Sequence, residues 1–218
     1  MAVRHQRKFR HTFLIRYNHN MDIKTVIFIG PQGSGKGTQI EKLKALLESR
    51  DRRRVVDIQT GRRFRALAAT QETFAEDKIA LTMSAGVLQP DFMVTILWGR
   101  AMLDQLDDKS HLLIDGFPRT VGQIPDLEDA FKFFERGAID VVNLETPEAV
   151  VRERMQSRAR ADDTAASIEE RLRWYREDTL PVIAYYQNRP NTSVHTINGT
   201  DTIDGVHVQI IAALKLNQ

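Results

Sequence analysis

The sequence predicts an α/β fold: a five-stranded parallel sheet with helices on both faces. Two observations lead to this prediction. Short apolar segments rich in Val, Ile and Leu alternate along the 218 residues with longer amphipathic segments, the pattern of parallel strands joined by crossover helices. In addition, a glycine-rich turn from Gly30 to Thr38 joins the first apolar segment to a helical pattern.

Five segments are predicted as strands. They run from Thr25 to Ile29, Val55 to Gln59, His111 to Asp115, Asp140 to Leu144 and Ser193 to Ile197. Each is nearly continuous in apolar residues, which is typical of strands buried on both faces. Right-handed crossovers between them would place helices on both sides of the sheet.

Six longer segments have a helical pattern. They run from Lys36 to Ser49, Phe92 to Gln105, Gln123 to Glu135, Pro147 to Arg158, Thr164 to Gln187 and Thr202 to Leu214. We expect Pro181 to kink or split the fifth, because proline lacks the backbone N–H that a helix interior needs. Between Thr60 and Pro90 only two short helical pieces are predicted, Phe64 to Ala69 and Ala75 to Ser84. They form a helical insert between the second and third strands.

Composition excludes several classes of function. The chain has 42% hydrophobic residues and no cysteine, so we expect one soluble domain without disulfides, thiol catalysis or Cys-ligated zinc. The absence of cysteine fits a reducing compartment, and we expect a cytoplasmic protein. No apolar run reaches the roughly 18 residues that a membrane helix needs, so no membrane contact is expected.

The positive charge is concentrated at the N-terminus. Residues 1–20 contain five Lys and Arg and no acid, so the remainder carries 26 minus 29, or −3. This segment is predicted to be disordered or dispensable, with the folded domain in residues 21–218. Three interpretations stay open: a transit peptide, which would imply a mitochondrial location, a polyanion-binding arm, or sequence upstream of a start at Met21, which we favour. Nucleic-acid binding is not expected.

The glycine-rich turn carries the first sign of chemistry. Glycines let successive backbone N–H groups point at one anion, while the following helix N-terminus and Lys36 add positive charge. The spacing is Gly-x4-Gly-Lys, but Gly37 stands before Thr38 where the common pattern has Ser or Thr directly. The alternative, a flexible turn with an incidental lysine, is disfavoured by the strand before it and the helix after it. A P-loop NTPase-like fold is therefore predicted.

A second candidate site follows the third strand. The run from His111 to Arg119 is an apolar strand that ends in Asp115. Because the carboxyl ends of parallel strands meet at one sheet edge, Asp115 is expected to hold Mg²⁺ through water beside the bound phosphates. A turn or capping role is the plainer alternative.

These motifs together resemble the nucleoside monophosphate kinases, most closely the adenylate kinase family. The resemblance rests on the loop Gly30 to Gln39 and on Asp115 to Thr120 with Gln123. It extends to Thr60-Gly61 with Arg65, to Gly86 to Asp91, and to the later arginines and aspartates. It covers the chain in order from about Asp22 to the C-terminus.

The resemblance implies a role for each matching residue. The ATP-binding residues would be Gly33, Ser34, Gly35, Lys36, Gly37, Thr38 and Arg154, the last stacking on the donor base. The AMP-binding residues would be Thr60, Gly61, Arg65, Gln89, Gly116, Arg119 and Gln123, and the residues around the transferred phosphoryl group would be Lys36, Arg119, Arg158, Arg160 and Arg171. Phosphoryl transfer needs positioning and positive charge rather than a general base, and arginine suits it.

The implied reaction is ATP + AMP ⇌ 2 ADP with Mg²⁺, in a monomer. AMP is favoured as acceptor because an amide such as that of Gln123 can donate and accept toward an adenine edge. Two alternatives stay open. One is a kinase for UMP, CMP or GMP, and the other is a nucleotide-binding regulatory protein with weak or no transfer.

The chain departs from the family pattern at two places. Only Ala159 separates Arg158 from Arg160, so the lid, about residues 158–163, is predicted to be minimal and the helix to break near Ala159, with Asp162 and Asp163 capping the next helix. In the acceptor insert, about residues 60–90, Arg62, Arg63 and Val87 replace an Asp, an apolar residue and a Lys. We expect these arginines to be solvated, with a neutral effect, although a shifted acceptor preference stays open.

Overall fold

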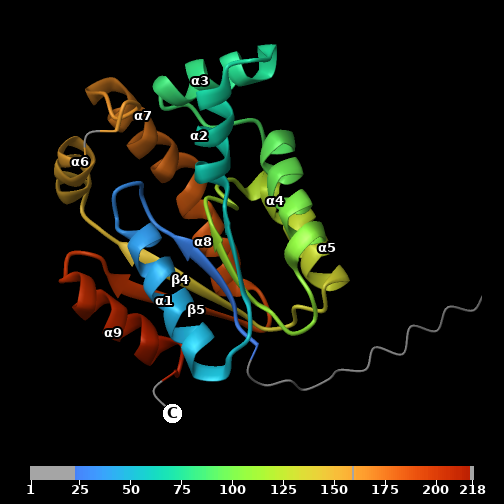
Figure 1. Ribbon diagram of the computed structural model, residues 1–218. Helices are drawn as coiled ribbons and strands as arrows, with labels where there is room; N and C mark the ends of the chain where they lie inside the picture. The colour runs from blue at the N-terminus through green and yellow to red at the C-terminus, as the bar shows by residue number, and fades with distance from the viewer. Residues whose placement is uncertain (1–22, 159, 217–218) are drawn as a thin grey trace, which may run out of the picture.

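Figure 1 shows the computed structural model, which describes residues 23–158 and 160–216. Within these ranges five parallel strands form one sheet in the order β2-β3-β1-β4-β5. The strands are β1 (Thr25–Ile29), β2 (Val55–Gln59), β3 (His111–Asp115), β4 (Ile139–Glu145) and β5 (Thr192–Asn198). The predicted fold class is confirmed; β4 and β5 are each one residue longer at both ends than expected. The N-terminal extension, residues 1–20, lies outside the described residues.

Helices cover both faces of the sheet (Figure 1). One core contains α1 (Lys36–Asp51) and α9 (Ile203–Ala213), and the other contains α4 (Asp91–Gln105), α5 (Ile124–Phe133) and α8 (Leu180–Asn188). Strand β1 alternates between them: Val26 and Phe28 face the first core, and Ile27 and Ile29 face the second. Successive strand residues point to opposite faces, so an all-apolar strand can be buried on both.

The prediction that every strand is buried on both faces is wrong for β5. Of its residues only Ile197 is buried, because β5 lies at the edge of the sheet beside β4 alone. An edge strand has a neighbour on one side only, so its polar residues can remain in contact with water.

The helical insert is present and stands above the carboxyl edge of the sheet (Figure 1). Helix α2 (Thr60–Thr70) begins directly where β2 ends, four residues before the predicted start. Helix α3 (Phe74–Ser84) opens with a capping box in which Thr73 and Glu76 each accept a hydrogen bond from the other's backbone N–H. This pairing satisfies two N–H groups that a helix start leaves without partners.

The fifth predicted helical segment, Thr164 to Gln187, is split, as the position of Pro181 predicts. Helix α7 (Ala165–Trp174) passes into a π-helical segment, η2 (Tyr175–Thr179), and α8 begins at Leu180. Helix α6 (Glu148–Ser157) ends one residue before Arg158, close to the predicted break at Ala159, which itself lies outside the described residues. Residues 158–164 thus connect α6 to α7.

The predicted capping role of Asp162 and Asp163 is wrong. The N-cap of α7 is Thr164, whose hydroxyl oxygen accepts from the N–H of Ser167 at 3.2 Å. Both aspartates instead form ion pairs with arginines. The helix therefore starts one residue later than expected, and the carboxylates belong to the functional site.

Across the described ranges, every helix is too short or too polar to traverse a lipid bilayer.

Candidate active site

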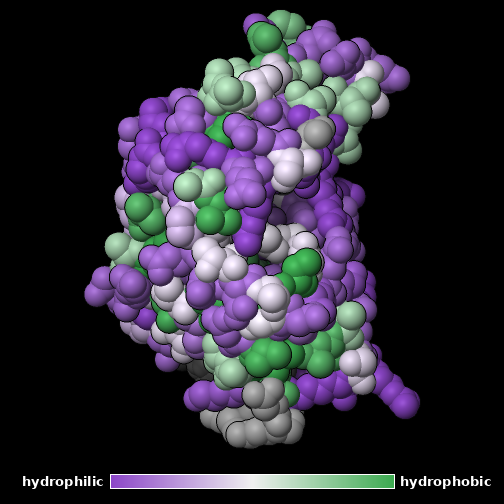
Figure 2. Space-filling model, turned by 90° about the vertical axis from the view of Figure 1, so that its left-hand side faces the viewer, coloured by the Kyte–Doolittle hydropathy of each residue, from purple (hydrophilic) through white to green (hydrophobic). Residues whose placement is uncertain are grey.

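A cavity of about 450 Å³ opens at the carboxyl edge of the sheet, between the glycine-rich loop and the helical insert. Figure 2 shows a hollow below the insert, bordered largely by hydrophilic side chains. Its lining includes every predicted site residue except Ser34. Ser34 is only 3% exposed and lies behind the loop, with its hydroxyl 3.5 Å from the Lys36 Nζ.

The loop that forms one wall owes its shape to glycine. Gly30 and Gly33 have φ angles of +148° and +90°, a region that residues with a side chain rarely adopt. A Cβ atom on Gly33 would lie 2.9 Å from the Met155 side chain, so α6 packs closely against the loop. No side chain caps the following helix α1. Its first N–H groups and its dipole therefore favour an anion at the loop.

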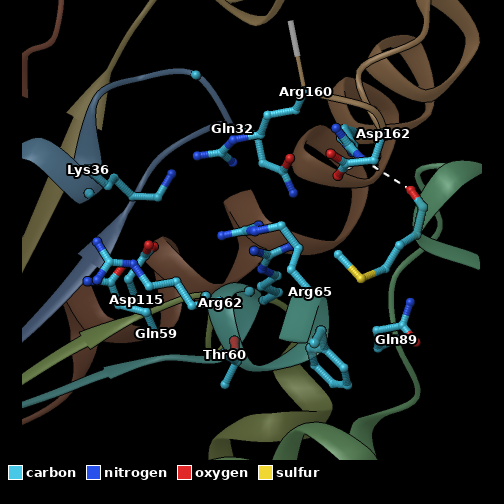
Figure 3. Close-up of a pocket in the computed structure, with 18 of the residues that line it drawn as sticks. Gln32, Lys36, Gln59, Thr60, Arg62, Arg65, Gln89, Asp115, Arg160 and Asp162 are labelled. Carbon is cyan, nitrogen blue, oxygen red and sulfur yellow. Dashed lines mark hydrogen bonds and ion pairs between the residues drawn. The ribbon is translucent and has the colours of Figure 1, made fainter. Parts of the chain in front are cut away.

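Lys36 is folded back onto its own loop. Its Nζ donates to the carbonyl oxygens of Gly30 and Pro31 at 2.7 and 2.8 Å. Burial lowers the pKa of this ammonium to about 8, although the carboxylate of Asp115 acts in the opposite direction. The lysine thus has polar partners in the absence of a ligand and lies at the mouth of the anion site (Figure 3).

Asp115 lies at the end of β3, beside the loop. The sheet register pairs it with Phe28 on β1 and Gln59 on β2. Its Oδ1 is buried and has no hydrogen-bond partner among the described residues. An unpartnered buried carboxylate oxygen is costly unless a ligand satisfies it. No group of three acidic or histidine side chains that could hold a metal occurs in the described ranges.

The opposite wall contains the predicted acceptor residues. The Arg119 guanidinium lies 4.9 Å from the centre of the Trp174 ring, and burial lowers its pKa. Its backbone N–H donates to Gln123 Oε1 at 2.8 Å. The other end of that amide, Nε2, donates to Asp91 at 2.7 Å. Gln123, predicted to read adenine, therefore has a protein partner on each of its two groups.

Other acceptor-side residues come from the insert. Thr60 and Gly61 begin α2, Arg65 lies one turn further on, and Gln89 follows α3. Burial and the nearby Arg160 lower the pKa of Arg65. The amide of Gln89 donates to the Thr82 hydroxyl at 2.8 Å. Figure 3 shows Arg65 and Arg160 projecting into the same space between the loop and the insert.

The short connection after α6 gathers a cluster of charges. The Asp163 carboxylate is fully buried and pairs with Arg158 and Arg171, each at 2.5 Å. Burial alone would raise the pKa of Asp163, but the two arginines outweigh it and lower that pKa. Asp162 pairs with Arg171 at 2.7 Å. Each of these two arginines is therefore held in place by a carboxylate, and both also line the cavity.

Arg154, predicted to stack on a base, instead donates to the carbonyl oxygen of Gly199 at 2.8 Å. The guanidinium thus connects α6 to the loop that follows β5, while it still lines the cavity.

Arg62 is exposed, as expected for a solvated arginine. Its guanidinium forms an ion pair with Glu41 on α1, and both residues line the cavity. Arg63 is half-buried and does not line it. Sequence reasoning also missed Asp91 and Trp174. Asp91 ends the motif Gly86 to Asp91 but was given no role, and it connects to the site through its contact with Gln123. Trp174 lies outside the motifs, and it lines the cavity and contacts Arg119.

The charge of the cavity is strongly positive. Eight cationic side chains line it, Lys36, Arg62, Arg65, Arg119, Arg154, Arg158, Arg160 and Arg171, against three anionic ones, Glu41, Asp115 and Asp162. An arginine cluster facing a phosphate-binding loop across one cavity defines a kinase of the P-loop class.

Comparison with known proteins identifies the family. The family model described as adenylate kinase matches residues 28–191. The chain is 36% identical over 189 residues to the adenylate kinase of Corynebacterium urealyticum, covering 87% of this chain and 98% of that protein. It is 38% identical to adenylate kinase 1 of a Nostoc species, over 87% of this chain and 97% of that protein. The chain therefore belongs to the adenylate kinase family, and its activity is that of an adenylate kinase.

Proposed function

We propose that this protein transfers the terminal phosphoryl group of ATP to AMP, forming two ADP, with Mg²⁺. The proposal is supported by one observation: the donor residues and the acceptor residues line the same cavity. The anion-binding loop forms one of its walls, Arg65, Arg119 and Gln123 form the other, and arginines lie between them. One protein thereby holds two phosphate-bearing ligands in reach of each other, which removes much of the entropic barrier to transfer.

On the donor side, the loop residues 33–38 hold the phosphates of ATP. When ATP binds, the Lys36 ammonium gives up its two hydrogen bonds to loop carbonyl oxygens and donates to phosphate oxygens instead. A phosphate charge beside it favours the ammonium form and so opposes the effect of burial on its pKa. Arg154, held by the Gly199 carbonyl, covers the base. An arginine face on an adenine ring contributes on the order of 1 kcal/mol.

On the acceptor side, Arg65 and Arg119 bind the phosphate of AMP, while Thr60, Gly61, Gln89, Gly116 and Gln123 surround its nucleoside. Arg119 is half-buried, and its guanidinium lies over the ring of Trp174. Such preorganisation lowers the cost of orienting the guanidinium when the phosphate arrives.

Arg158, Arg160 and Arg171 surround the group in transfer. Their planar, permanently charged forks match phosphate oxygens, and the charge of the moving group spreads over those oxygens. The carboxylates of Asp162 and Asp163 hold two of these arginines in position.

Asp115 fits a magnesium site. Its buried Oδ1 lacks a partner among the described residues, and it ends the strand next to the phosphate loop. Bound magnesium usually keeps several waters and contacts only one or two carboxylates, so a single acid at this place suffices. When bound, Mg²⁺ neutralises charge on the donor phosphates; the role of Asp115 is to accept hydrogen bonds from its waters.

The domain organisation follows from the same proposal. Residues 21–218 form the catalytic domain, residues 60–90 the acceptor insert, and residues 158–163 a minimal lid. We propose a monomer and a cytoplasmic location, where its nucleotide substrates are plentiful.

The proposal is tested with a panel of acceptors. Purified protein with ATP and Mg²⁺ is given AMP, UMP, CMP or GMP, and nucleoside diphosphate formation is measured. We expect AMP to be the preferred acceptor and chelation of Mg²⁺ to abolish transfer. Lys36→Met is expected to lower kcat by about 10²-fold or more, whereas Lys44→Met, on the exposed side of α1, leaves it unchanged. A preference for another acceptor, or full activity of K36M, would overturn the proposal.

A further inference from the structure

The side chain of Gln123 is held between two partners of opposite character. Its Oε1 accepts from the backbone N–H of Arg119 at 2.8 Å, and its Nε2 donates to the Asp91 carboxylate at 2.7 Å. A backbone N–H can only donate, and an ionised carboxylate can only accept. The orientation of the amide is therefore decided by its surroundings.

Rotating this amide by 180° would break both hydrogen bonds. It would also place a donor against a donor and an acceptor against an acceptor. The NH₂ group would face the N–H of Arg119, and Oε1 would face the carboxylate of Asp91. The surroundings are themselves fixed. The hydroxyl of Thr179 donates to the Arg119 carbonyl oxygen at 2.9 Å, and the hydroxyl of Thr120 lies 3.3 Å from Asp91 Oδ2. Gln123 is 3% exposed, so water cannot readily replace the lost partners.

A locked amide presents a directional pattern to the cavity. One lone pair of Oε1 and one hydrogen of Nε2 remain after the two protein bonds are made. A base bound there must offer a donor to Oε1 and an acceptor to Nε2. The 6-amino group of adenine is such a donor, and its neighbouring ring nitrogens are acceptors. A 6-oxo purine places an acceptor at the same position and would require the rotated amide.

We propose that Asp91 is a positioning residue that locks the Gln123 amide and thereby makes the acceptor site select 6-amino over 6-oxo purines. This inference rests on the proposed function, since it assumes that an acceptor base reaches Gln123. Asp91 begins α4, 32 positions before Gln123 in the chain, and is itself exposed. It acts through Gln123 and does not line the cavity.

The test compares AMP with inosine monophosphate, which differs at the 6-position and at the protonation of N1. For each acceptor, kcat and KM are measured in the wild-type protein, in D91N and in D126N. D91N is nearly isosteric, but its carboxamide can turn either a carbonyl or an NH₂ group toward Gln123. D126N is the matched control, because Asp126 also accepts a hydrogen bond from α4, from Thr95, but does not contact Gln123.

We expect the ratio of kcat/KM for AMP to that for inosine monophosphate to fall about tenfold or more in D91N, mainly through KM, and to stay unchanged in D126N. Loss of the carboxylate charge affects both acceptors alike and cancels in this ratio. The inference would be overturned if D91N kept the wild-type ratio or lost activity equally with both acceptors. Either result would leave the proposed function intact. If D91N does not fold, the same ratio is measured in D91A, and the inference is judged by that value. Failure of the wild-type protein to phosphorylate AMP would overturn the proposed function as well.

Discussion

Arg171 on α7 donates to the carbonyl oxygen of Met83 at the end of α3, with Nη2 and O 3.2 Å apart. Three residues further along α7, Trp174 Nε1 donates to the carbonyl oxygen of Gly86 at 3.0 Å. A Cβ atom on Gly86 would overlap the backbone of Ser167, so the two segments are in close contact. The helical insert of residues 60–90 is thereby connected to α7.

Trp174→Phe is expected to weaken this connection while keeping an aromatic face under Arg119. The carbonyl of Gly86 loses its buried partner, which costs about 1–3 kcal/mol in the free energy of unfolding. We expect the KM for AMP to rise several-fold and the KM for ATP to change little. Urea denaturation and steady-state kinetics measure the two effects.

The matched control for this substitution is Trp98→Phe. The Nε1 of Trp98 has no partner among the described residues, so its removal breaks no hydrogen bond. An unchanged KM for AMP in W174F, or an equal rise in W98F, would contradict the proposed connection.

Arg62→Gln probes the ion pair between the insert and α1. Both side chains of the pair are more than half exposed, Arg62 by 53% and Glu41 by 61%, so the free energy of unfolding is expected to change by less than about 1 kcal/mol. Arg62 nevertheless contributes positive charge to the cavity lining. We therefore expect the KM for AMP to rise a few-fold, and more at low ionic strength because salt screens exposed charges. Arg63→Gln, at the neighbouring arginine that does not line the cavity, should leave this KM unaltered. The same KM in R62Q and wild type at low salt would rule out the effect.

His111 makes the stability of the fold dependent on pH. Its Nδ1 accepts from the backbone N–H of Lys24 at 3.0 Å, and its Nε2 lies 3.1 Å from the Asp51 carboxylate. The ring is therefore neutral, with its hydrogen on Nε2. Burial lowers its pKa below the usual 6.5, although Asp51 acts in the opposite direction; Arg53 and Arg136 also lower it.

The sign of the pH effect follows from proton binding. Below pH 6.5 the unfolded chain binds a proton at His111 before the folded chain does, so stability is complete above that pH and falls as the pH decreases. Urea unfolding of wild type and His111→Asn between pH 7.5 and 5.5 tests this. The asparagine carbonyl can accept from Lys24, and the variant is expected to lose less stability on acidification. Equal losses in both proteins would show that another group is responsible.

Much of the fold could be predicted from local patterns. The strand that ends at Ile29 is followed by a turn whose glycines permit φ angles that other residues avoid, and Lys36 begins the helix as expected. The predictions were wrong where contacts with other elements determine the structure. The apolar run that made β5 resemble a central strand could not reveal its position at the sheet edge. Asp162 and Asp163 have the residue type of helix caps, but the arginines of α6 and α7 compete for them.

The sequence by itself determined that a phosphate-binding loop and a strand-terminal acid lie at one edge of a parallel sheet, because glycine spacing and apolar strand patterns are local properties of the chain. The arginines were assigned to the same edge through the resemblance to a family. The tertiary structure alone decided how these groups are oriented. The Gln123 amide takes its direction from Asp91, which is 32 positions earlier, and Arg119 takes its position from Trp174, which is 55 positions later. Such contacts depend on packing between elements that are distant along the chain, and no motif records them.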